Sequence, residues 1–283
     1  MERVTDKKYW MDGYLKSNLN TAVYNMDFDW DFVFIISGDG MVRVGKSVLA
    51  QQIGYYIAYK KGTPFSMQNI CFTGEQLINT AHHLPKNSVL IYDEAREGLD
   101  AKKTMESMTK SLLDFFAECG MYNDFIIVIL PDFFELNKNI AISRSDALIN
   151  VFRTSKDRQL SNGDNILEYE RGHFEFYNRK EKRELYIKGK KLFCSYDIGK
   201  RNFYGEFKNY WVVNKEEYLK KKIAHIQRVR AKKDDKFLIV LKALCKDNSQ
   251  RKVAEILSEQ GLPISQTRIN QLLNQIREKT IEK

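Results

Sequence analysis

Eight consecutive residues of this chain have the types and the spacing of a phosphate-binding loop. They read Gly40-Met41-Val42-Arg43-Val44-Gly45-Lys46-Ser47 and fit the pattern G-x-x-x-x-G-K-[S/T]. The glycines let backbone N–H groups turn towards phosphate oxygens, and the helix that follows adds the positive end of its dipole. Lys46 would reach the β- and γ-phosphates of ATP, while the Ser47 hydroxyl would bind Mg²⁺. A glycine-rich turn that binds no ligand is the alternative.

The pattern therefore predicts ATP and Mg²⁺ as cofactors. The residues expected to contact the nucleotide are Gly40, Val42, Arg43, Val44, Gly45, Lys46, Ser47 and Val48.

A pair of acids follows a second apolar run and would complete such a site. Asp93 and Glu94 come directly after Val89–Tyr92, which reads as a buried strand. In nucleotide hydrolases with this loop, an acid at the end of a buried strand beside the loop strand holds the metal. We therefore assign Asp93, together with Ser47, to Mg²⁺ and Glu94 to activation of the attacking water. Two adjacent acids also suit a helix N-cap, which is the structural alternative.

Hydrolysis also needs positive charge near the γ-phosphate in the transition state, often from an arginine of a neighbouring subunit. Arg144, just before the apolar run 147–152, is the first candidate and Arg96 is the second. Either could instead form a surface salt bridge. The strand predicted at 125–130 ends in Leu130-Pro131-Asp132, without a Gln or Asn to sense the γ-phosphate. That role therefore has no candidate in the sequence.

The elements that must position these residues follow from the hydrophobic pattern. Strands that are apolar throughout and alternate with helices indicate a parallel sheet covered on both faces. The predicted fold class is α/β, a P-loop core with a mostly parallel sheet. Strands are predicted at 32–36, 69–72, 89–92, 125–130 and 147–152, and helices within 1–30 and at 46–61, 75–83 and 104–118.

From about residue 154 the composition changes to aromatic and charged stretches. Residues 155–165 read as a polar loop, and 169–177, 182–187 and 190–196 read as antiparallel strands. A charged helical pattern with a basic middle follows at 213–233. The predicted domains are an ATPase core over 1–153, a β-rich extension over 154–213, a basic helical linker over 214–234 and a helical domain over 235–283.

The C-terminal residues, 235–283, read as three helices with an apolar inner face. Ser249 and Ser265 are placed to cap the second and third helices, on either side of the turn Gly261-Leu262-Pro263. This arrangement resembles a helix-turn-helix DNA-binding domain, with a winged or other variant also open. A three-helix bundle that serves oligomerisation is the alternative. The residues predicted to contact DNA are Lys252, Gln266, Thr267, Arg268 and Asn270.

Composition and charge restrict the class of protein. The chain has 283 residues, of which 43% are hydrophobic and 29% charged, as in ordinary globular proteins. No apolar run is long enough to span a bilayer, and the first ten residues do not form a signal peptide. The four cysteines are widely spaced, which argues against a zinc site or a disulfide framework and suits the reducing cytoplasm.

The net charge of +9 is distributed unevenly along the chain. Residues 1–150 hold 15 Lys+Arg against 19 Asp+Glu, a net charge of −4. Residues 151–283 hold 31 against 18, a net charge of +13. The basic half indicates a polyanionic partner such as DNA, although lysine-rich surfaces also serve solubility alone.

Three features together resemble the additional-strand, catalytic-glutamate class of P-loop ATPases: the loop at 40–47, the LIYDEA run at 90–95 and the strand-proximal Arg144. Within that class, residues 30–153 are most similar to the RecA-like HerA/FtsK translocases and packaging ATPases of viruses and mobile elements. The resemblance implies a RecA-like core, a homo-oligomeric ring and ATP-driven movement of double-stranded DNA.

The sequence thus predicts a cytoplasmic, ATP-hydrolysing motor for double-stranded DNA, acting with partner proteins of a viral or mobile-element machine and not in a membrane. An AAA+-like loader or regulator of replication or transposition, in which ATP times assembly on DNA, is the second hypothesis. A DNA-binding regulator that senses nucleotide without hydrolysing it is the third.

Overall fold

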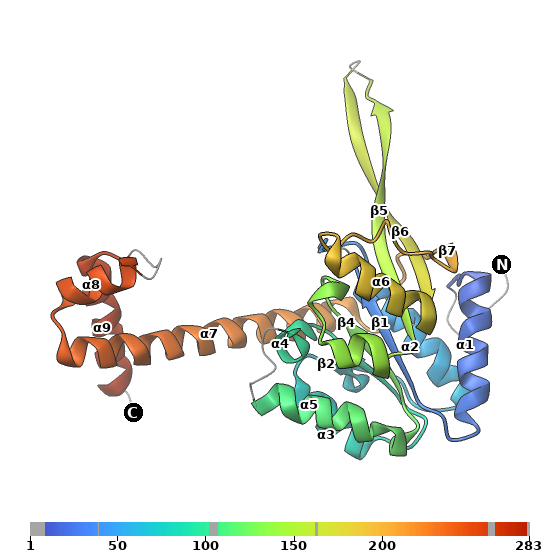
Figure 1. Cartoon of the computed structure of the whole chain (residues 1–283), viewed down its shortest axis with the longest axis horizontal. Coiled ribbons are helices and arrows are strands. Elements are labelled where there is room, and N and C mark those ends of the chain that lie inside the picture. The colour runs from blue at the N-terminus through green and yellow to red at the C-terminus, as the bar shows by residue number, and fades with distance from the viewer. Residues whose placement is uncertain (1–8, 39, 102–106, 162–163, 260–263, 282–283) are drawn as a thin grey trace. The chain divides into compact units, whose positions relative to one another are not determined.

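A mixed sheet runs through the N-terminal three quarters of the chain (Figure 1). The computed structural model describes residues 9–38, 40–101, 107–161, 164–259 and 264–281. Within them the strand order is β2-β3-β4-β1-β5-β6-β7. The chain divides into two units between Tyr218 and Leu219. No helix in the described ranges has the length and apolar content needed to cross a membrane.

The sheet is parallel from β2 to β5 and antiparallel from β5 to β7, which makes the first unit an α/β fold consistent with a P-loop or Rossmann-like architecture. In chain order the strands are β1 (Phe32–Ser37), β2 (Ile70–Cys71), β3 (Val89–Tyr92), β4 (Phe125–Ile129), β5 (Ala147–Gln159), β6 (Asn165–Asn178) and β7 (Phe203–Glu206). The helices are α1 (Gly13–Met26), α2 (Lys46–Lys61), α3 (Gly74–His83), α4 (Arg96–Leu99), α5 (Ser107–Glu118), α6 (Arg179–Lys191), α7 (Lys215–Asp247), α8 (Gln250–Glu259) and α9 (Gln266–Ile281).

Helices cover both faces of the central strands, as the continuous apolar runs predicted. Phe34 and Ile36 of β1 pack into the core formed with α1 and α2. Val33 and Ile35 alternate with them and pack into the opposite core, which includes α3, α5 and α6. Side chains alternate across a strand, so a central strand that is covered on both sides needs apolar residues on both faces. The continuous apolar run of β1 meets this need.

The predicted strand–loop–helix unit is confirmed. β1 ends at Ser37, the loop follows, and α2 begins at Lys46 with Gly45 as its N-cap residue. Gly62 ends α2 in a left-handed conformation with φ +68°, which glycine adopts without strain. The predicted strands at 69–72, 89–92 and 125–130 and the helix at 75–83 also lie where expected. Residues 1–8 and 104–106 of the predicted helices lie outside the described residues.

The segment after residue 154 differs from the prediction in two ways. The stretch 182–187, predicted as a strand, belongs to helix α6, and so does the start of 190–196. The Asn178 side chain caps this helix by accepting a hydrogen bond from the Glu181 N–H at 3.0 Å. Most of the predicted polar loop at 155–165 instead forms the hairpin of β5 and β6, which projects beyond the other strands of the first unit (Figure 1).

The predicted domain limits do not coincide with structural boundaries. β5 crosses the expected limit at 153, and β6 and β7 extend the same sheet, so the β-rich extension belongs to the first unit. The predicted linker at 214–234 and the first helix of the C-terminal domain are one helix, α7, because no glycine or proline interrupts 215–247.

In the second unit, α7, α8 and α9 surround a small apolar core. Leu241, Val253, Leu257 and Ile269 are buried in it. The predicted serine caps are present: Ser249 accepts from the Lys252 N–H at 3.4 Å, and Ser265 from the Arg268 N–H at 3.2 Å. The predicted turn at 261–263 lies outside the described residues. The helical nature of this unit is therefore as predicted.

Candidate functional site

The glycine-rich loop leaves β1 at the carboxyl end of the parallel strands. Gly40 and Gly45 have φ values of +67° and +109°, which side-chain-bearing residues rarely adopt. A Cβ on Gly38 would lie 2.8 Å from the Lys46 ammonium nitrogen and 3.1 Å from the Val151 carbonyl oxygen. Gly40 and Gly45 thus suit the left-handed turns of the loop, and Gly38 suits its close approach to β5 and Lys46.

The lysine and the exposed part of the loop are held by local contacts. Lys46 donates to the Met41 carbonyl oxygen at 2.6 Å, which folds its side chain back along the loop. Arg43, at φ +61°, and Val42 are exposed, whereas Val44 and Val48 are buried against the core. Of the eight expected contact residues, Val44 and Val48 thus offer a ligand only their backbone groups.

The structure brings Ser47 and Asp93 together although they lie 46 positions apart. The Ser47 hydroxyl donates to the Asp93 Oδ2 atom at 3.1 Å. The Asp93 carboxylate is almost fully buried, with 1% of its surface exposed. β3, which Asp93 directly follows, is not beside β1: β4 lies between them, paired with both. We expected the acid at the end of a strand adjacent to β1. The structure corrects this: the strand that ends at the acid is one position further along the sheet.

The Ser47 hydroxyl and the Asp93 carboxylate are oxygen donors of the kind that the expected magnesium ion needs. Mg²⁺ prefers hard oxygen ligands and is commonly held by one or two protein groups together with substrate phosphates. No group of three or more His, Cys, Asp or Glu side chains in the described ranges could hold a metal by itself. The donor set therefore suits a metal that arrives with a nucleotide.

The backbone on either side of Glu94 is held by β2 and β4, the two strands that flank β3. The Asp93 N–H donates to the Cys71 carbonyl oxygen at 2.9 Å, and the Ala95 N–H donates to the Ile129 carbonyl oxygen at 3.0 Å. Between these anchors Glu94 takes φ +64°, a left-handed conformation that costs a non-glycine residue roughly 1–2 kcal/mol. The N-cap of α4 is Ala95. The helix-cap explanation of the two acids therefore does not apply.

A residue that sequence reasoning missed completes the surroundings of Asp93. The Tyr218 hydroxyl, from the first turn of α7, donates to the same Oδ2 atom that accepts from Ser47. Tyr218 is buried, and its ring packs near those of Phe72 and Trp211, with centroids 5.8 and 5.2 Å away. In the sequence it stands within a charged helical stretch, where nothing distinguishes it from a surface tyrosine.

Polar groups also gather where β1 and β4 end. The Tyr196 hydroxyl lies 3.1 Å from the Ser37 hydroxyl oxygen, donates to the Asp132 carboxylate at 3.2 Å and accepts from the Phe133 N–H at 2.9 Å. Burial raises the Tyr196 pKa well above its ordinary value, so this hydroxyl stays protonated. Asn150, paired with Ser37, is also buried, and its amide oxygen has no hydrogen-bond partner in the described part of the chain. It can accept a hydrogen bond from a ligand or water at this edge.

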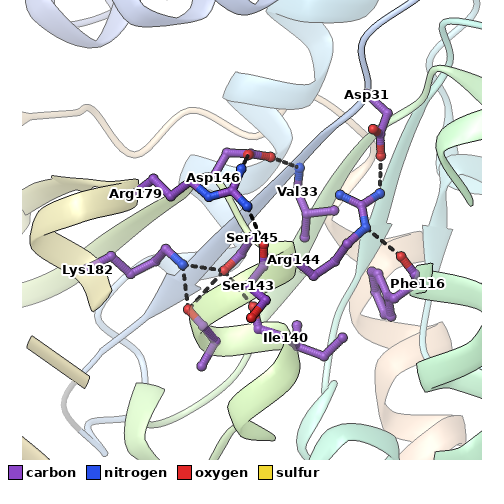
Figure 2. Close-up of polar contacts among 11 residues, drawn as sticks. Asp31, Val33, Phe116, Ile140, Ser143, Arg144, Ser145, Asp146, Arg179 and Lys182 are labelled. Carbon is purple, nitrogen blue, oxygen red and sulfur yellow. Dashed lines mark hydrogen bonds and ion pairs between the residues drawn. The ribbon is translucent and has the colours of Figure 1, made fainter. Parts of the chain in front are cut away.

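Arg144, the first candidate for a trans-acting arginine, lies among the polar contacts drawn in Figure 2. It precedes β5, and its partner Asp31 precedes β1, so both lie at the amino ends of these parallel strands, whereas the loop follows the carboxyl end of β1. Its guanidinium forms an ion pair with Asp31 and donates to the Phe116 carbonyl oxygen and the Cys119 sulfur. These contacts favour the salt-bridge alternative.

The residues around Arg144 are anchored as well (Figure 2). The Asp146 carboxylate accepts from the Val33 N–H at 2.9 Å, and Arg179 donates to the Ser143 carbonyl oxygen at 2.6 Å. Lys182, fully buried, donates to the Ser145 hydroxyl at 2.8 Å, and burial lowers its pKa to about 7. The cluster therefore holds the turn before β5 in place.

Arg96, the second candidate, lies two residues after Glu94. It forms an ion pair with Glu135 at 2.9 Å, and 54% of its side chain is exposed. Exposed ion pairs of this kind contribute little to stability. Arg96 thus remains a candidate by position alone.

The residues predicted to contact DNA are all exposed on helices of the second unit. Gln266, Thr267, Arg268 and Asn270 are exposed on α9, and Lys252 is exposed on α8. The Gln250 amide donates to the Asn270 side-chain oxygen at 2.9 Å, which links the polar faces of the two helices. Arg268 donates to Gln271 at 3.1 Å.

Protein-family models give no match to this sequence, and neither do curated proteins. The comparisons identify no family, so the arguments for function rest on the geometry described above.

Proposed function

We propose that this protein is an ATP-hydrolysing motor for double-stranded DNA. The observation that supports it best is the hydrogen bond between Ser47 and Asp93, which joins the two residues that the sequence assigns to one metal. The strand order β3-β4-β1 adds to this, because it inserts one strand between the loop strand and the acid strand. The additional-strand class is named for such an inserted strand.

In this proposal each residue of the site has a separate task. The loop backbone and Lys46 bind the phosphates of ATP and stabilise the negative charge that develops in the transition state. Ser47 and Asp93 hold Mg²⁺, which neutralises phosphate charge when it is bound. Glu94 accepts the proton of the attacking water, a role that suits a partly buried carboxylate next to the metal ligand Asp93. We assign no trans-acting arginine.

The second unit supplies the proposed contact with DNA. Its exposed polar residues on α9 include the side-chain types that read base edges, and Lys252 suits a phosphate. A loader that uses ATP to time its assembly on DNA would use the same residues, and so would a nucleotide-sensing regulator.

Steady-state hydrolysis with and without duplex DNA tests the proposal. We expect ATP hydrolysis that duplex DNA stimulates, and its loss in Lys46→Ala and Glu94→Gln. Lys60→Ala is the matched control, because Lys60 is exposed near the far end of the same helix. Glu94→Gln should still bind ATP, because it removes only the proton acceptor. Hydrolysis that Lys46→Ala leaves unchanged would refute the proposed site.

A triplex-displacement assay then separates a motor from a loader. A motor displaces a third strand from duplex DNA only while ATP is hydrolysed. A third strand left in place, with DNA-stimulated hydrolysis intact, would favour the loader. Nucleotide binding without any hydrolysis would favour the regulator.

A further inference from the structure

Tyr218 contacts the proposed metal site from an element that neither motif contains. Its hydroxyl donates to Asp93 Oδ2, the oxygen that also accepts from Ser47. The other carboxylate oxygen, Oδ1, accepts from the Glu94 N–H at 3.0 Å. A carboxylate offers about four lone-pair positions, so a single oxygen can accept from both hydroxyls at once.

The start of α7 is itself tied to the helix of the phosphate loop. The Gln52 amide of α2 donates to the carbonyl oxygens of Lys208 and Tyr210, at 2.7 and 2.9 Å. The Val213 N–H donates to the Gln51 side-chain oxygen at 3.5 Å. The segment that leads into α7 therefore has a fixed position relative to the loop.

The first turn of α7 is closed by a cap next to the tyrosine. The Asn214 side chain accepts from the Glu217 N–H at 3.0 Å, and its carbonyl oxygen accepts from the Tyr218 N–H at 3.0 Å. With its ring packed by Phe72 and Trp211, Tyr218 has little freedom to turn its hydroxyl away from Asp93. The tyrosine is thus held independently of the carboxylate that it contacts.

We propose that Tyr218 is a positioning residue that orients Asp93 for Mg²⁺. The inference rests on the proposed function, because it assigns Asp93 to the metal. A hydrogen bond to a charged group from a fixed donor restricts the rotation of the carboxylate, so the metal meets an oriented ligand. It also makes the site depend on the first turn of α7, an element outside the nucleotide motifs.

The test compares Tyr218→Phe with Tyr186→Phe. Both variants keep the aromatic ring and lose one buried hydroxyl, but Tyr186 donates to the Leu136 carbonyl oxygen at 2.8 Å, in the core that includes α6. Binding of ADP is measured by isothermal titration calorimetry, at a series of MgCl₂ concentrations and in EDTA. ADP is used so that no hydrolysis interferes.

In Tyr218→Phe the Mg²⁺ concentration needed for half-maximal strengthening of ADP binding should rise about 10- to 100-fold, the usual effect of losing a partner of a metal ligand. Binding in EDTA should stay as in the wild type, and Tyr186→Phe should keep the wild-type Mg²⁺ dependence. Equal Mg²⁺ dependence in the two variants would overturn the positioning role. If Lys46→Ala instead binds ADP as tightly as the wild type does, the proposed function is overturned, and this inference with it.

Discussion

Replacing Arg144 by alanine separates a structural role from a catalytic role in trans. The guanidinium holds the Asp31 carboxylate, the Phe116 carbonyl oxygen and the Cys119 sulfur. Removing one partner of a buried ion pair costs about 3–5 kcal/mol, because the other charge stays in a poorly solvated place. The side chains of Arg144 and Asp31 are 21% and 19% exposed, so solvent screens part of this loss. We therefore expect a loss of about 3 kcal/mol in the free energy of unfolding.

Urea denaturation and thermal unfolding measure this loss directly. For a unit of this size, about 3 kcal/mol corresponds to a melting temperature lower by roughly 6–12 °C. A double-mutant cycle with Asp31→Ala should give a coupling energy of about 1–3 kcal/mol, because the two side chains share one interaction. At 25 °C the rate of ATP hydrolysis per folded molecule should stay close to that of the wild type.

A trans-acting arginine would behave in the opposite way. Arg144→Ala would then unfold like the wild type but lose hydrolysis. Mixing it with Lys46→Ala would restore part of the activity, since each variant would supply what the other lacks. That combination of results would refute the structural role.

Three further variants test other parts of the molecule. Gly45→Ala, at φ +109° and with its new methyl 2.8 Å from the Phe207 ring, should weaken ADP binding at least tenfold in calorimetry, with little change at Gly62→Ala. Burial raises the Asp124 pKa to about 7, so the native state binds this proton more tightly than the unfolded state and loses stability as pH rises from about 4 to 7. Asp124→Asn should therefore stabilise the protein at pH 8 relative to pH 5, by up to about 3 kcal/mol in urea denaturation; a difference that does not depend on pH would contradict this. Arg268→Glu with Lys252→Glu should weaken duplex binding at least tenfold in fluorescence anisotropy while ADP binding is kept, and unchanged affinity would favour the oligomerisation bundle.

The elements around the loop were predictable because their sequence signals are local. β1 is apolar on both faces, and the glycines that follow it mark the start of a helix. Asp93 was predictable in the same way, because it directly follows the apolar run that forms β3. What the sequence cannot show is that Ser47 and Asp93 meet across an intervening strand, because this depends on the order of strands in the sheet. The contact between Tyr218 and Asp93 also depends on the tertiary arrangement and has no local signal in the sequence.

The errors after residue 154 have physical causes as well. Both faces of the outer part of the β5–β6 hairpin meet solvent, so no alternation of apolar and polar residues marks it as strand. Ion pairs, Lys156 with Glu170 at 2.8 Å and Arg158 with Glu168 at 3.1 Å, link the two strands there. In α6 a local signal was present and overlooked: Asn178 followed three residues later by Glu181 is a helix start.

The position of Tyr218 also bears on where a fragment that contains the proposed nucleotide site should end. A fragment that stops at residue 213, the limit suggested by composition, would keep the whole loop, both acids and every strand of the sheet. It would nevertheless lose the hydroxyl that contacts Asp93 and uncover the Phe72 and Trp211 rings. A fragment that stops at residue 218 retains them. A fragment meant to hold the proposed nucleotide site should therefore extend to Tyr218, beyond the last strand of the sheet.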